Sequence, residues 1–153
     1  MNIIAKIGIY TVMVTALLSC AKESDFPNTP VLEFRDFKRI SPTEAIWVLG
    51  FTDGDGDVGV RNKNDSDNFI VDIYVVKNGV GALDSNLKAS NYRVPVVQGV
   101  RTAKGVEGKI EITINGLDFL KAEGYDSIYY SGYLIDRSFN ASNTVYTPVF
   151  STN

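Results

Sequence analysis

Apolar and polar residues alternate along Lys109-Ile110-Glu111-Ile112-Thr113-Ile114-Asn115. Because successive side chains of a strand point to opposite faces of a sheet, this pattern predicts a half-buried β-strand with its three isoleucines inward. The stretch 69–77 repeats the pattern, with Asp72 expected to face water. The stretch 44–51 is apolar on both faces, which is typical of a central strand, and it places Trp47 in the core. The chain is therefore predicted to be all-β.

Strand-forming residues are dense in seven stretches, at 31–39, 44–51, 69–77, 92–100, 109–115, 127–136 and 144–150. They are rich in Val, Ile, Tyr, Phe and Thr, which suit a pleated, half-buried surface. Turn-forming pairs such as Asn78-Gly79 and Asn115-Gly116 separate them, and residues 117–123 could form a short helical turn. Seven short strands over about 120 residues predict an immunoglobulin-like antiparallel β-sandwich, a domain formed by residues 31–153.

The C-terminal part of this domain carries a set of spaced tyrosines and a polar turn. Leu117, Leu120, Gly124-Tyr125 and Tyr129 precede a strand that ends in Asp136-Arg137-Ser138-Phe139-Asn140-Ala141-Ser142-Asn143. The arrangement resembles the last two strands of fibronectin type III and cadherin-like bacterial domains, with their tyrosine corner and Asp-x-x-x-Asn-x-Ser turn. The resemblance implies an Ig-like fold and says little about function, because such sandwiches host many activities.

The N-terminus reads as an export signal. Lys6 is followed by an apolar run at 7–18 that is too short to span a bilayer, and the run closes with Leu17-Leu18-Ser19-Cys20. This order resembles the bacterial lipobox, which implies removal of a signal peptide at 1–19 and acylation of Cys20. An uncleaved signal helix is the alternative. Lipidation also accounts for a lone cysteine in an exported protein, and several acyl chains would give stable membrane anchoring.

Residues 20–30 are expected to form an extended, mobile tether, because prolines and polar residues dominate them. The Ala21-Lys22-Glu23-Ser24-Asp25 start resembles the charged export signal of Bacteroidetes surface lipoproteins. The resemblance implies the outer face of the outer membrane, whereas an ordinary linker would leave the protein on the periplasmic side. The first partner predicted from the sequence is thus a membrane, reached through the lipid anchor.

Composition narrows the remaining functions. Without residues 1–19 the chain has 134 residues with 14 basic and 18 acidic side chains, and this mildly acidic balance argues against nucleic acid as a partner. Glycans, proteins and metal ions remain. The sequence has no histidine, and lipid would occupy its single cysteine, so histidine-dependent and thiol catalysis and histidine or thiolate metal sites are excluded. We therefore expect a protein that is not an enzyme.

One loop is rich in acids, Phe51-Thr52-Asp53-Gly54-Asp55-Gly56-Asp57-Val58-Gly59. Carboxylates at alternate positions with glycines between them can wrap a hard cation, so Asp53, Asp55 and Asp57 are a candidate calcium site. Asp136 could approach from the strand before last, and Asp65 and Asp67 follow the loop. The loop lacks the glycine and glutamate of an EF-hand. Plain turn chemistry is the alternative, because Asp-Gly pairs are common in hairpins.

The Phe-Thr-Asp-Gly-Asp-Gly-Asp motif resembles one in uncharacterised Bacteroidetes lipoproteins with an Ig-like domain. The predicted function is a lipid-anchored, non-enzymatic binding or accessory module of the cell envelope that calcium could stabilise. A carbohydrate-binding lipoprotein of a glycan-uptake system is the second hypothesis, with Tyr125, Tyr129, Tyr130 and Tyr133 stacking on sugars, unless these tyrosines are half-buried at the sheet rims. A carboxylate-dependent hydrolase is less favoured, because a charged turn should give its acids one common environment.

Overall fold

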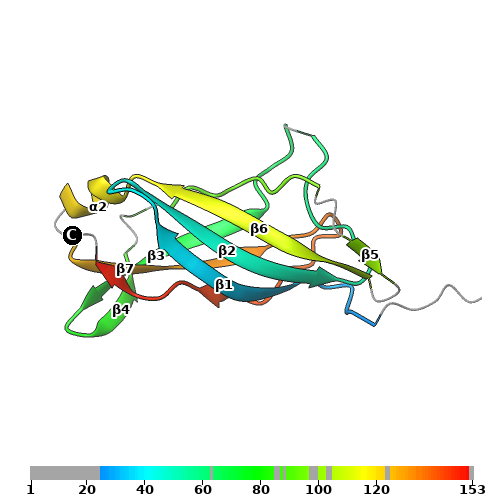
Figure 1. The fold of residues 1–153 in the computed structure, drawn as a ribbon, viewed down its shortest axis with the longest axis horizontal. Coiled ribbons are helices and arrows are strands. Elements are labelled where there is room, and N and C mark those ends of the chain that lie inside the picture. Colours follow the sequence, from blue (N-terminus) through cyan, green and yellow to red (C-terminus); the bar gives the residue numbers. More distant parts are fainter. Residues whose placement is uncertain are drawn as a thin grey trace, which may run out of the picture.

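The chain is all-β and forms two antiparallel sheets in a sandwich-like arrangement (Figure 1). The computed structural model describes residues 25–62, 64–84, 87, 89–96, 100–102, 105–122 and 125–151, and the predicted signal peptide and Cys20 lie outside these. The strands are β1 (Val31–Arg39), β2 (Glu44–Asp53), β3 (Phe69–Lys77), β4 (Val80–Leu83), β5 (Val100–Thr102), β6 (Gly105–Asn115), β7 (Ser127–Leu134), β8 (Val145–Tyr146) and β9 (Phe150–Ser151). A short helix, α2 (Leu117–Ala122), confirms the predicted helical turn.

Consecutive strands pair two by two within one sheet, and the chain changes sheet after every second strand up to β7. The first sheet has the order β1-β2-β6-β5, and the second has the order β4-β3-β7-β8, with β9 also paired to β7. The chain therefore crosses between the sheets after β2, after β4 and after β6. The last crossing brings it to the second sheet, where β7, β8 and β9 lie. Both long loops after β2 and β7 lie at the end of the sandwich where the N-terminal segment enters, on the right in Figure 1.

The core lies between the two sheets and confirms the alternation read from the sequence. Ile110, Ile112 and Ile114 are each no more than 4% exposed, while Lys109 and Glu111 face solvent. On β3 the inward residues Val71, Ile73 and Val75 are buried and Asp72 is exposed. Trp47 is fully buried and meets the edge of Phe69, with ring centroids 5.6 Å apart and planes at 81°.

The Asn78-Gly79 pair forms a tight hairpin, as predicted, and it leads into a strand that the sequence did not reveal. Lys77 pairs with Val80, so the loop has two residues, and both have positive φ (53° and 78°). This is the geometry that two-residue hairpins favour, because it matches the twist of the flanking strands. The four residues of β4 after it are all exposed, which explains why no buried pattern marked them.

The predicted strand at 92–100 is wrong over residues 92–96, and residues 97–99 lie outside the described part of the chain. In its place are isolated bridges, Tyr92 with Phe69 and Pro95 with Val60, and regular pairing starts at Val100. This segment carries the chain from β4 in the second sheet to β5 in the first. Its described backbone therefore makes isolated bridges in place of one continuous ladder. Pro95 also has no N–H to donate to a ladder.

The predicted closing strand at 144–150 is split into β8 and β9, which both pair with β7. Pro148 lies between them and cannot continue a ladder of hydrogen bonds. Thr147 bridges the break, because its N–H donates to the Tyr130 carbonyl (2.9 Å) and its hydroxyl accepts from the Tyr130 N–H (2.9 Å).

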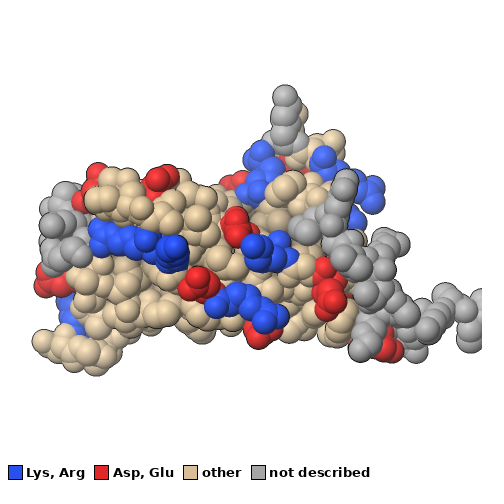
Figure 2. Space-filling model, viewed as in Figure 1, with Lys and Arg blue, Asp and Glu red and all other residues tan. Residues whose placement is uncertain are grey.

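Charges of both signs are mixed over the face that carries β1, β2 and β6 (Figure 2). Some of them pair along a strand, as Glu33 does with Arg35 and Lys109 with Glu111, each at 2.8 Å. These side chains are more than half exposed, so each pair contributes less than about 1 kcal/mol. The face shown thus has no large area of one sign among the described residues.

Candidate metal centre

Three carboxylates from distant parts of the chain meet at one end of the sandwich. Asp53 is the last residue of β2, Asp57 lies in the loop that follows, and Asp136 comes two residues after β7. One oxygen of each lies within 4.8 Å of one oxygen of each of the others. The cluster forms because β2 belongs to the first sheet and β7 to the second, and both strands end on the same side.

Asp53 is the most deeply buried acid of the cluster. Its side chain is fully buried, and its Oδ2 accepts hydrogen bonds from the N–H groups of Asp57 (2.7 Å) and Val58 (3.3 Å). Its Oδ1 is buried and has no hydrogen-bond partner among the described residues. Desolvation raises the pKa of Asp53 from 3.8 to about 6, and the charges of Asp55 and Asp57 add to that rise while the Asp57 N–H opposes it.

The other two acids are held in place by the turn that follows β7. Oδ2 of Asp57 accepts a hydrogen bond from the Ser138 hydroxyl (2.7 Å), whereas its Oδ1 is buried and has no partner in the described part of the chain. Asp136 is 5% exposed, and its two oxygens accept from the backbone N–H and the side-chain amide of Asn140, both at 2.8 Å. The Asp-x-x-x-Asn-x-Ser turn therefore positions one acid and, through Ser138, a second.

Arg137 lies next to the cluster but does not neutralise it. Its guanidinium donates to the backbone carbonyls of Val58 (3.2 Å), Gly59 (2.8 Å) and Gly56 (3.5 Å) and so clamps the acidic loop to the turn. None of the ion pairs between described residues involves Asp53, Asp57 or Asp136. Burying acids side by side without a cationic partner is costly, and a bound metal ion would remove that cost.

The site only partly follows the sequence prediction. Asp53 and Asp57 are brought together, and Asp136 joins them, as the sequence had allowed. Asp55 is exposed and is not part of the cluster. Asp65 instead accepts hydrogen bonds from the N–H groups of Arg61 and Asn62, which lower its pKa, and Asp67 pairs with Arg93 at 3.5 Å.

The expectation that the acids of the loop share one environment is also wrong. Asp53 is fully buried, with a raised pKa, whereas Asp55, two residues on, is exposed. The difference arises because Asp53 still belongs to β2 and points between the sheets. Sequence reasoning missed the clamping role of Arg137, although its place directly after Asp136 was a signal that could have indicated it.

The geometry suits one hard cation. Calcium binds oxygens at about 2.3–2.6 Å, so two oxygens on one ion are at most about 5 Å apart, and the separations in the cluster do not exceed 4.8 Å. The buried Oδ1 atoms of Asp53 and Asp57 supply two oxygens that accept no hydrogen bond from any described residue. Asp53, Asp57 and Asp136 could therefore hold a metal ion together.

The N-terminal segment packs against the acidic loop, so the expected free tether is shorter than predicted. The Gly54 N–H donates to the Pro27 carbonyl (2.8 Å), and Pro30 is fully buried. A Cβ on Gly54 would lie 2.3 Å from the Phe26 carbonyl oxygen, so only glycine fits at this contact. Among the described residues the packed domain thus begins near residue 26, and not at residue 31.

The tyrosines proposed for sugar stacking have different surroundings. Tyr130 is 3% exposed and belongs to the core, and the Tyr125 hydroxyl donates to Asp84 (3.0 Å). Tyr129 is half-buried on the outer face of the second sheet, where its ring stacks on Tyr74 at 4.8 Å and 8° and lies 6.2 Å from Tyr146. Tyr133 is also half-buried. Only part of the predicted set therefore faces outward.

Comparison of the chain with protein-family models, with curated proteins and with solved structures found no match. Within the described ranges, no helix has the length and apolar character needed to cross a membrane.

Proposed function

We propose that the chain is a non-enzymatic, lipid-anchored module of the bacterial cell envelope whose fold is stabilised by one calcium ion between Asp53, Asp57 and Asp136. The observation that carries the calcium site is the fully buried Asp53 carboxylate, which has one unpartnered oxygen and two acidic neighbours. Calcium neutralises such a cluster and accepts six to eight oxygens. The loop would then serve stability and would present a rigid surface to a protein or glycan partner.

The same observation favours a structural role for these acids over a hydrolytic one. A hydrolase needs one carboxyl group with a raised pKa, and Asp53 has this property. However, its side chain is fully buried, so it cannot contact a substrate while the loop is closed. An internal metal ligand has no need of such access.

The strand order supports the Ig-like assignment within the all-β class. Constant-type immunoglobulin domains place strands A, B, E and D in one sheet and C, F and G in the other. The order β1-β2-β6-β5 matches A-B-E-D, and β3, β7 and β8 match C, F and G, with β4 as an added edge strand. The strands from Val31 to Ser151 would then form one such domain.

The anchor and the metal centre would lie at the same end of the module. The N-terminal segment reaches the sandwich at the acidic loop through the contact between Gly54 and Pro27. Asp25 follows Cys20 by five positions, and these five steps span at most about 18 Å when extended. Lipidation at Cys20 would therefore bring the metal-bearing end close to the membrane surface.

Calcium binding is tested by thermal unfolding of the lipoprotein with calcium or with a chelator. A ligand present at a hundred times its Kd stabilises the native state by about 2.7 kcal/mol, so we expect the midpoint to rise by several degrees. The Asp136→Asn variant should lose this rise, whereas Asp55→Asn, outside the cluster, should retain it. If millimolar calcium leaves the unfolding midpoint of the unchanged protein where it is, the protein does not bind calcium at this site.

The anchor has a separate test. In cells, the Cys20→Ala variant should move from the membrane fraction to the soluble fraction, because no acyl chain can be attached. If it still sediments with membranes, the lipid anchor is wrong, whatever the outcome with calcium.

A second candidate function is glycan binding, and one observation favours it. Tyr74, Tyr129 and Tyr146 form a row of rings across the outer face of the second sheet, and Tyr146 is 53% exposed. Aromatic faces of this kind can stack on sugar rings. The test is a polysaccharide array with the unchanged protein and with Tyr146→Ala. If neither protein binds a glycan, or if both bind equally well, the tyrosine row has no role in glycan binding.

A further inference from the structure

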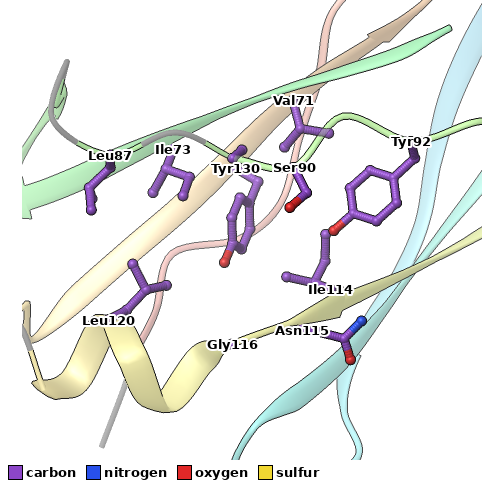
Figure 3. A pocket seen from close by; sticks show the side chains of 11 residues that line it. Val71, Ile73, Leu87, Ser90, Tyr92, Ile114, Asn115, Gly116, Leu120 and Tyr130 are labelled. Carbon is purple, nitrogen blue, oxygen red and sulfur yellow. The ribbon is translucent and has the colours of Figure 1, made fainter. Parts of the chain in front are cut away.

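A cavity of about 390 Å³ lies between the two sheets at the α2 end, opposite to the metal centre (Figure 3). Its walls are mainly apolar and come from β3, β6, β7 and α2, with Val71, Ile73, Ile114, Leu120 and Tyr130 among them. These five side chains are at most 6% exposed in the domain as a whole. Asn115 and Gly116, which are exposed, also line the cavity, so it reaches the surface at the turn between β6 and α2.

Hydroxyl groups project into this apolar space. Figure 3 shows the side chains of Ser90, Tyr92 and Tyr130 directed toward the interior of the cavity. Tyr130 is 3% exposed, and neither tyrosine hydroxyl has a hydrogen-bond partner among the described residues. Burial raises the pKa of both tyrosines, so both hydroxyls stay protonated and can donate.

The described part of the lining disfavours charged ligands. Among the residues that the structure describes, no Lys, Arg, Asp or Glu lines the cavity. A charged group moved from water into such a site would lose its hydration without gaining a partner, whereas an uncharged oxygen could accept from a tyrosine hydroxyl. The volume is at the lower end of the roughly 300–1,000 Å³ of small-molecule sites.

We propose that this cavity binds a small, uncharged, mainly apolar molecule with one hydroxyl or carbonyl oxygen, such as a medium-chain alcohol, and that Tyr130 hydrogen-bonds this oxygen. The apolar part of the ligand would contact Ile73, Ile114 and Leu120, and the oxygen would accept a hydrogen bond from the Tyr130 hydroxyl. The proposal is independent of the calcium site and of the lipid anchor, because no residue is shared.

The test uses the chain from residue 20 with Cys20→Ala, which contains every described strand and carries no acyl group. The neutral fluorophore N-phenyl-1-naphthylamine is titrated into the protein, and 1-decanol or decanoate is added as competitor at a pH of about 8. We expect saturable fluorophore binding and displacement by decanol. Decanoate should compete at least about tenfold more weakly, because its carboxylate is ionised.

Two variants place the binding in this cavity. Tyr130→Phe keeps the ring and removes the hydroxyl. It should weaken the binding of decanol by about two- to tenfold and leave the binding of the fluorophore unchanged. Tyr133→Phe, on the same strand but facing outward, is the matched control and should change neither. Ile114→Phe should fill the space and reduce binding of both, with its fold checked by circular dichroism.

Several results would overturn the proposal. Absence of saturable fluorophore binding would show that the cavity holds only water, which its hydroxyls could also bind. Equal competition by decanol and decanoate would show that the cavity does not prefer uncharged ligands. An unchanged decanol affinity in Tyr130→Phe would show that Tyr130 does not hydrogen-bond the ligand. These results would leave the calcium and membrane tests untouched.

Discussion

Replacing the buried acid Asp53 by asparagine should stabilise the cation-free protein. Burial raises the pKa of Asp53 from 3.8 to about 6, so above this pH the native state contains a buried charge that the unfolded state exposes to water. The difference corresponds to about 3 kcal/mol of unfolding free energy at neutral pH. Asp53→Asn has nearly the same shape, can still accept from the Asp57 N–H, and removes the charge.

The sign of the pH dependence follows from the direction of the pKa change. The native state binds more protons than the unfolded state between pH 3.8 and about 6, so the unfolding free energy should fall as the pH rises through this window. We expect this fall in the chelator-treated protein and its absence in Asp53→Asn. At neutral pH the variant should melt about 10 °C higher than the unchanged protein in chelator.

Calcium should remove most of this difference in stability between the variant and the unchanged protein. Saturating calcium should stabilise the unchanged protein by about 2–3 kcal/mol and leave Asp53→Asn unaffected, because the amide is a weaker ligand than a carboxylate. The assay is urea unfolding monitored by Trp47 fluorescence, at pH values from about 4 to 8, with calcium or chelator.

Asp55→Asn is the control, because Asp55 is exposed and lies outside the cluster. It should change the unfolding free energy by less than about 0.5 kcal/mol. The reasoning is refuted if Asp53→Asn destabilises the chelator-treated protein at neutral pH, or if the unchanged protein shows no loss of stability between pH 4 and 6. Either result would mean that the buried carboxylate is already compensated.

Three further substitutions test how the site and the core are held. Gly54→Ala should lower the unfolding free energy by about 2 kcal/mol, because its Cβ would lie 2.3 Å from the Phe26 carbonyl oxygen. Arg137→Lys should cost about 1–2 kcal/mol and weaken calcium binding in calorimetry, because one ammonium cannot replace the forked donation to Gly59 and its neighbours. Ile112→Ala should cost about 2–5 kcal/mol in urea unfolding, since the side chain is 4% exposed.

Each of these substitutions has a matched control. In Gly50→Ala the three atoms nearest to the new Cβ belong to the flexible, exposed side chain of Arg35. Arg35→Lys alters a surface ion pair, so each of these two variants should change stability by less than about 1 kcal/mol. Thr113→Ala lies outward beside Ile112 and should have an equally small effect. If a control costs as much as its partner, the contact assigned to that partner is not the source of the effect.

Much of the fold could be predicted because burial alternates along its strands. The bounds of β1 and β3 agree with the predicted 31–39 and 69–77, and the inward residues of β6 are those of the alternating stretch. Local chemistry also fixes the hairpin at Asn78-Gly79. These features depend on neighbours in the chain, so the sequence displays them directly.

The wrong predictions concern segments whose role depends on the rest of the fold. The apolar residues at 92–100 resemble a strand, but the crossing between the sheets uses them in isolated bridges. The exposed β4 has no buried face to mark it, and Pro148 divides the last strand into two short pieces. Propensity along the chain cannot indicate which sheet a segment must reach.

By itself the sequence determined that the chain is all-β, that it has no histidine and a single cysteine, and that Asp53 and Asp57 lie in one acidic loop. Only the tertiary structure decided that Asp55 stays in solvent and that Asp136, on the other sheet, completes the cluster. The physical reason is that burial and neighbours in space decide whether a carboxylate is charged and whether it can bind a metal ion. Both are set by how two sheets pack, and not by spacing along the chain.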